Sequence, residues 1–138
     1  MPLKALALPV ALLLVATPAR AGCQVALDGV SFGGIDASRR TTGTGRVRVD
    51  CDAAVAYEIA IGGSRAMSGP GGATLDFGLY MDAGRNVAWG DGERHGSTLT
   101  NSSDGVHADS LTIYGEIPAQ PGIAAGDYSA SLLVTLNF

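Results

Sequence analysis

The chain has 138 residues, 46% of them hydrophobic and 16% charged, which suits one compact domain with one core and is too short for two. Its 13 acidic residues outnumber its nine basic residues. This acidic balance argues against nucleic acids and anionic membranes as partners.

The first 21 residues predict a cleaved signal peptide. Lys4 precedes an apolar run over residues 5–16, and the triplet Ala19-Arg20-Ala21 follows Pro18. This order is typical of a secretory signal cleaved after Ala21, which leaves residues 22–138 as one exported domain. The apolar run has about a dozen residues, whereas a transmembrane helix needs about 20, so we expect no membrane span.

The chain contains two cysteines, Cys23 and Cys51. Exported proteins meet an oxidising compartment, so these residues predict a disulfide, which stabilises a domain by about 3 to 4 kcal/mol in the chain-entropy model. A lipoprotein is the alternative, because Ala21-Gly22-Cys23 resembles the end of a lipidation box. Arg20 stands where such boxes have an aliphatic residue, and lipidation of Cys23 would leave Cys51 unpaired, so the disulfide is favoured.

Apolar and polar residues alternate along several segments, and this period of two predicts half-buried β-strands. The predicted strands cover residues 46–51, 57–61, 75–81, 111–117 and 128–138. Gly, Ser, Thr, Asn and Asp are frequent in the stretches between them, which we interpret as turns over residues 62–73, 82–97, 101–109 and 118–126. Short strands with glycine-rich turns indicate an all-β, antiparallel sandwich or barrel.

The last predicted strand has the clearest alternation. Its apolar face consists of Tyr128, Ala130, Leu132, Val134, Leu136 and Phe138, and Leu133 alone interrupts the polar face. A strand that runs to the last residue is unusual, because chain ends fray unless they are paired on both edges or reserved for a partner.

Catalytic and metal sites have weak support in the sequence. The candidate metal ligands are His95 and His107 with their neighbours Asp91, Glu93, Asp104 and Asp109, but their spacing matches no metal signature, and solvated loops are the favoured interpretation. We interpret the segment from Trp89 to Gly92 as a tight turn with Trp89 packed on the sandwich. Bonded cysteines cannot act as nucleophiles, and we expect no enzyme, metal or cofactor.

An ordered set of motifs spans residues 22–138. It consists of Cys23, Phe32-Gly33, Thr42-Gly43-Thr44-Gly45, Cys51, Ser64-Arg65-Ala66-Met67, Leu79-Tyr80-Met81-Asp82, Trp89-Gly90-Asp91-Gly92, Tyr114-Gly115-Glu116-Ile117-Pro118-Ala119, Gly126-Asp127-Tyr128 and the strand ending at Phe138. In this order the chain resembles the spore coat protein U domain, the family that also supplies subunits of archaic chaperone-usher pili.

The resemblance implies an immunoglobulin-like, pilin-like β-sandwich that lacks its final strand. A groove beside the C-terminal strand would then accept a strand from a periplasmic chaperone or from the next pilin subunit, with an outer-membrane usher as a further partner. By position in the family's terminal strand, the groove face would include Leu132, Val134, Leu136 and Phe138, and the Phe138 carboxylate would meet a basic cleft of the chaperone. The resemblance also implies passage through the periplasm to the cell surface or a pilus, with roles in adhesion or biofilms.

One departure from the family pattern concerns the N-terminus. Fibre-forming pilins carry an extension ahead of the first cysteine that serves as the donor strand, whereas cleavage after Ala21 leaves only Gly22 before Cys23. We therefore expect a subunit that accepts a strand without giving one, placed at the end of a fibre. The alternative is a self-contained, secreted coat-type surface protein that does not polymerise.

Overall fold

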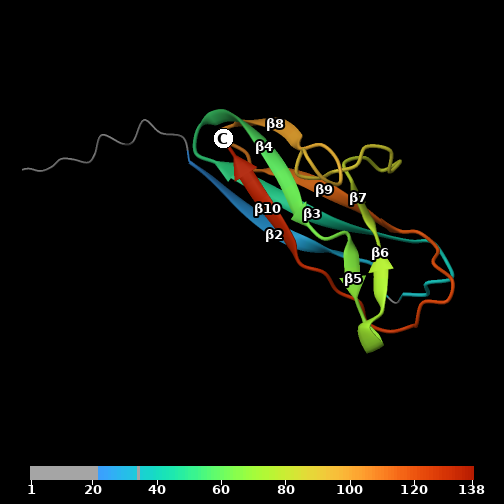
Figure 1. Cartoon of the computed structure of the whole chain (residues 1–138). Helices are drawn as coiled ribbons and strands as arrows, with labels where there is room; N and C mark the ends of the chain where they lie inside the picture. Colours follow the sequence, from blue (N-terminus) through green and yellow to red (C-terminus); the bar gives the residue numbers. More distant parts are fainter. Residues whose placement is uncertain (1–21, 34) are drawn as a thin grey trace, which may run out of the picture.

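The computed structural model describes residues 22–33 and 35–138, and the predicted signal peptide, residues 1–21, lies outside the described residues. These residues form an all-β sandwich of two antiparallel sheets with a small hairpin at one end (Figure 1). One sheet has the order β2-β3-β9-β7, from Cys23–Ser31, Thr41–Cys51, Asp109–Ile117 and Gly78–Tyr80. The other has the order β10-β4-β8, from Leu132–Asn137, Ala54–Gly63 and Leu99–Asp104. The hairpin pairs β5, Ala66–Ser68, with β6, Thr74–Asp76, around the 3-10 turn Pro70–Gly72.

The predicted all-β, immunoglobulin-like sandwich with one disulfide is confirmed. Cys23 and Cys51 are opposite residues of β2 and β3 and are joined by a disulfide. Within the described residues, no helix has the length and apolar character needed to cross a bilayer.

Period-two alternation accounts for the core. In β3, Val47, Val49 and Cys51 are buried, whereas the residues between them are exposed, because successive side chains of a strand point to opposite faces. The fully buried large side chains from both sheets and their connections are Trp89, Ile59, Ile61, Leu75, Leu79, Ile113, Ile117, Val47 and Val49.

The predicted strand over residues 75–81 is divided between the hairpin and the four-stranded sheet. Leu75 belongs to β6 and Leu79 to β7, while the N–H of Phe77, between them, donates to the Arg65 carbonyl over 2.9 Å. All three apolar side chains remain buried, so the chain changes its backbone partner without changing the face that it presents to the core.

Three further strands differ from the sequence prediction. β2 was not expected, β5 lies within the predicted turn over residues 62–73, and β8 covers residues 101–104 of another predicted turn. β8 lies at a sheet edge, where Thr100, Asn101 and Ser102 are exposed. An exposed edge strand needs no apolar alternation, and polar residues there discourage unwanted pairing, so its sequence looks like a turn.

The C-terminal strand is shorter than the predicted 128–138. Its regular pairing with β4 covers Leu132–Asn137, because residues 64 and 65 loop out between β4 and β5. Ser129 nevertheless pairs with Ser68 of β5 through two backbone hydrogen bonds of 2.8 and 3.0 Å. Ser129 and residues 132–137 are therefore paired along one side with successive parts of the same chain.

Trp89 closes one side of the sandwich, between β4 and β7. Its side chain is fully buried, its Nε1 donates to the Ile59 carbonyl over 3.0 Å, and its N–H donates to the Leu79 carbonyl over 2.9 Å. The Ile61 N–H donates to the Gly90 carbonyl over 3.0 Å. This segment thus bridges both sheets, and the predicted packing of Trp89 on the sandwich is confirmed.

Tyr57 links the two sheets near the disulfide. Its hydroxyl donates to Oδ2 of Asp109 on β9 over 2.6 Å and accepts from Nδ2 of Asn101 over 3.0 Å. Burial, followed by the hydrogen bond to Asp109, raises the pKa of Tyr57 to about 12. The neutral phenol is therefore the form that the folded state favours.

Replacing Tyr57 with Phe should lower the free energy of unfolding by about 1 kcal/mol at neutral pH, because Asp109 and Asn101 lose a buried partner. A raised folded-state pKa gives a stabilisation that is complete below the unfolded value of 10.0 and is lost as pH rises through about 12. The difference in phenolate absorbance between the wild type and Y57F should therefore show the Tyr57 phenolate forming near pH 12. A difference that appears already near pH 10 would contradict this assignment.

Candidate functional site

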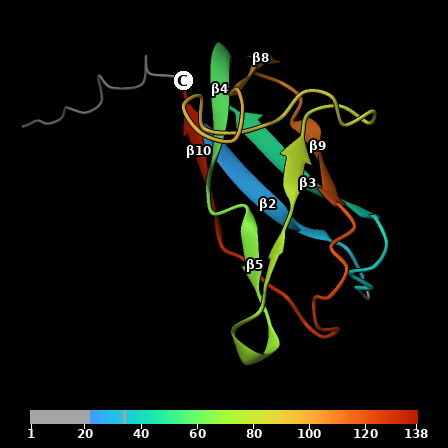
Figure 2. The ribbon, with the colours of Figure 1, turned by 45° about the vertical axis from the view of Figure 1, so that its right-hand side comes forward.

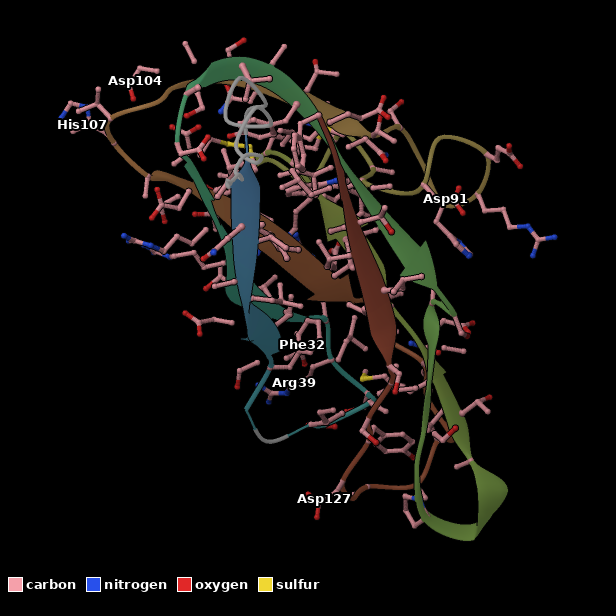
Figure 3. All side chains as sticks on the ribbon, turned by 90° about the vertical axis from the view of Figure 1, so that its left-hand side faces the viewer. Phe32, Arg39, Asp91, Asp104, His107 and Asp127 are labelled. Carbon is pink, nitrogen blue, oxygen red and sulfur yellow. A yellow bond between two sulfur atoms is a disulfide. The ribbon has the colours of Figure 1, made fainter. Side chains whose placement is uncertain are left out.

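The side of the sandwich opposite Trp89 is open. A groove with a volume of about 440 Å³ lies between β2 and the chain leading into β10. Figure 2 shows the ribbons of β2 and β10 on the same side of the sandwich. Its walls include Leu27, Val30 and Phe32 on one side and Tyr128, Ala130 and Leu132 on the other, and its floor includes Met67, Phe77 and Leu79. Figure 3 faces this side, with Phe32 at the end of β2.

The β2 wall presents core-facing side chains that the core does not cover. Val25 lies opposite Val49, and Leu27 lies opposite Val47, so all four point to the same face of the sheet. Val49 and Val47 have no exposed surface, whereas Val25 is 40% exposed and Leu27 is 43% exposed. The difference arises because β3 has neighbours on both sides and β2 has one.

The β10 wall has the same character. Leu136 lies opposite Ile59, and Val134 lies opposite Ile61. Both isoleucines are fully buried, whereas Val134 and Leu136 are half-buried. The two walls therefore form one apolar strip that the described part of the chain leaves partly uncovered.

The backbone along both walls has a free edge. Within residues 22–33 and 35–138, β10 pairs with β4 alone and β2 pairs with β3 alone. Most of β8 lies in the predicted turn over residues 101–109. It pairs with the edge of β4 that faces away from β10. Unpaired N–H and C=O groups beside an apolar strip are the features that an added β-strand requires.

The floor near Phe32 is shaped by glycines. Gly43 and Gly115 are opposite residues of β3 and β9, and a Cβ on Gly115 would lie 2.7 Å from the Phe32 ring. The β2–β3 register shifts between Asp28 and Ser31, and this irregularity allows Phe32 to turn over the glycines. Phe32 then meets Phe77 edge-on, with ring centroids 6.5 Å apart.

The sequence-predicted groove residues fall in different places. Leu132 lines the groove, and Val134 and Leu136 continue its face along β10. Phe138 is 57% exposed and borders a separate shallow hollow with Ala56 and Ser102. The β2 wall was missed, although the alternation of Val25 and Leu27 with Ala26 and Asp28 is a signal that could have identified it.

The histidines lie in exposed loops away from the groove. His107 Nδ1 is 2.8 Å from Asp104 Oδ2, and this hydrogen bond raises the pKa of His107 and lowers the pKa of Asp104. Asp91, on another loop, accepts backbone hydrogen bonds from Glu93 and Arg94, which lower its pKa (Figure 3). The described residues contain no group of three or more His, Cys, Asp or Glu side chains placed to hold a metal ion.

Comparison with known proteins gives a family and a likeness to solved structures. Residues 10–135 match the family model of the Spore Coat Protein U domain. The fold is similar to a chain in the crystal structure of the CsuC–CsuE chaperone–tip adhesion subunit pre-assembly complex from archaic chaperone-usher Csu pili of Acinetobacter baumannii, with a TM-score of 0.67 and 18% identity. The likeness covers 86% of this chain and 40% of that chain, so this chain spans well under half of that one. No curated protein matches the sequence.

The paired valines of β2 and β3 provide a test of the open groove. Val49→Ala should lower the free energy of unfolding by about 2 kcal/mol, because it leaves a cavity in a closed core. Val25→Ala should cost less than about 1 kcal/mol, because part of its surface already contacts water. Urea unfolding of both variants measures the difference, and equal losses would mean that Val25 is as enclosed as its partner.

Proposed function

The chain belongs to the Spore Coat Protein U domain family, and we propose that it is a pilin-like subunit of an archaic chaperone-usher system whose groove is completed by a strand from another protein chain. The open groove between β2 and β10 is the observation that carries this proposal. Among the residues that the structure describes, no strand pairs with the outer edge of either rim, and the inner face is apolar and partly exposed.

An inserted strand would use two kinds of contact. Its backbone would hydrogen-bond along residues 129–137, a span of about 30 Å at the usual rise per residue. Its alternate side chains would cover Val25 and Leu27 on one rim and Leu132, Val134 and Leu136 on the other. This is β-strand addition of the kind known for chaperone–pilin complexes, in which main-chain bonds give affinity and side-chain pockets give register.

A periplasmic chaperone is the first partner in this proposal, followed by an outer-membrane usher and other pilin subunits. An apolar sheet edge without a partner favours aggregation, so an exported chain of this design needs protection until its groove is filled. β8, the opposite edge of the same sheet, carries polar exposed residues and needs no such protection. The subunit would then pass through the periplasm to the cell surface.

The chemistry of the groove supports a structural role and not an enzymatic one. The described residues that line it include no His, Cys, Asp, Glu, Lys or Arg. Catalytic sites usually bring titratable groups together in a pocket, whereas this lining offers apolar side chains, glycines, two serines and the Tyr128 phenol. Such a surface suits an extended peptide with alternating apolar residues.

Substitutions on β10 test the groove. Val134→Arg places a charge on the half-buried groove face and should abolish co-purification with the chaperone, as should deletion of residues 134–138. Thr135→Arg is the matched control, because Thr135 is exposed on the outer face of the same strand, and it should retain binding.

Val25→Arg, on the opposite rim, separates loss of the groove from local misfolding of β10 and should also abolish binding. Unchanged pull-down of Val134→Arg and of the deletion variant would refute the assigned edge. A wild-type chain that is monomeric and melts cooperatively without any partner would favour the alternative, a self-contained coat-type surface protein.

We also propose that the subunit occupies the end of a fibre. With cleavage after Ala21, the one residue before Cys23 is too short to fill a neighbour's groove. In fibres of this type each extension fills the tip-ward neighbour, so a subunit without one lies at the tip. Immunogold labelling should mark fibre tips, and labels distributed along the shaft would contradict this position.

A further inference from the structure

Gly22 and Asp52 form a close pair directly beyond the disulfide. The Gly22 nitrogen donates to Oδ1 of Asp52 over 2.7 Å, and the Asp52 N–H donates to the Gly22 carbonyl over 2.9 Å. A Cβ on Gly22 would lie 3.2 Å from Oδ2 of Asp52. Glycine therefore lets the Asp52 carboxylate come close to the backbone at this position. The pair lengthens the contact between β2 and β3 by one residue past Cys23 and Cys51.

The carboxylates around this pair have no cationic partner among the described residues. Asp50 and Asp52 flank Cys51 at the strand end and border one shallow hollow with Gly22 and Cys23. Neither carboxylate belongs to an ion pair in the part of the chain that the structure describes. A positive charge at the Gly22 nitrogen would therefore meet a complementary site.

We propose that removal of the signal peptide supplies this charge and fastens β2. Signal peptidase would hydrolyse the bond between Ala21 and Gly22, with the hydroxyl of water going to the Ala21 carbonyl carbon and its proton to the Gly22 nitrogen. The resulting amine takes up a second proton at neutral pH and becomes an α-ammonium. The hydrogen bond from Gly22 to Asp52 then becomes a charge-assisted ion pair that the precursor cannot form.

The location of the pair gives it a consequence for the groove. β2 has one neighbouring strand, and its inner residues Val25 and Leu27 are partly exposed, so its position depends strongly on its attachment to β3. An ion pair next to the disulfide also holds Cys23 opposite Cys51 before the sulfurs are joined. Maturation would thereby favour both oxidation of the cysteines and a fixed groove wall, whatever segment later occupies the groove.

The test compares two forms of the full exported domain, with and without its chaperone. One form begins at Gly22, as intact mass verifies, and the other carries three serines ahead of Gly22, so that its Gly22 nitrogen is a neutral amide. Each form is made with Asp52 and with Asp52→Asn, which removes the charge and keeps an acceptor oxygen. Asp50→Asn is the matched control, because it removes the neighbouring charge without touching the hydrogen bond to Gly22.

The readout is the equilibrium of the Cys23–Cys51 disulfide with dithiothreitol. In the form that begins at Gly22, Asp52→Asn should shift this equilibrium toward reduction about two- to five-fold more than it does in the extended form, the range of an exposed ion pair. The excess should shrink in 1 M NaCl and be smaller for Asp50→Asn, because Asp50 borders the same hollow but makes no hydrogen bond to Gly22. An equal effect of Asp52→Asn in both forms, or an exported chain whose mass does not begin at Gly22, would overturn the proposal.

Discussion

The groove exists because two sheet edges on the same side of the sandwich have no backbone partner among the described residues. An edge strand keeps its inner face covered only when another segment lies beside it, as the Trp89 segment does for β7, and no described segment does this for β2 and β10. Val25 and Val49 show the effect, because they lie opposite each other on one face of the sheet. Val25, on the edge strand β2, is partly exposed, whereas Val49, on β3 with a strand on each side, is buried. In the proposed function, a strand from a partner would bind along these two edges and would need no polar site.

On the other side of the sandwich, a segment of the same chain covers the gap between the two sheets. Trp89 fills the gap between the sheets, and backbone hydrogen bonds from its segment reach Leu79 on β7 and Ile61 on β4. Arg65 strengthens this closure, since its Nη2 donates to the carbonyls of Ile61 and Trp89, both over 2.9 Å. The molecule is therefore asymmetric, with one side closed by its own chain and one side available.

The shape of the open side depends on residues without side chains. Gly43 and Gly115 leave space on the inner face of the four-stranded sheet, and Phe32 occupies it after β2 departs from regular register. A Cβ on Gly43 would lie 2.1 Å from the Ser31 carbonyl oxygen, so the irregular end of β2 and this glycine require each other. The result is an apolar floor that continues from the core into the groove.

From the amino acids alone we predicted the fold class and the faces of most strands, because alternation reports which side chains of a strand point inward, as at Val47 and Val49. The two cysteines of an exported chain predicted the disulfide. The same alternation placed Leu132, Val134 and Leu136 on one face of the last strand, the face predicted to border a groove. We did not predict β2 as the second wall, the polar edge strand β8, or the division of residues 75–81 between two sheets. Only the tertiary structure decided these, because the neighbours of a strand come from distant parts of the chain, and whether an edge is paired, covered or free is a property of that assembly and not of any local pattern.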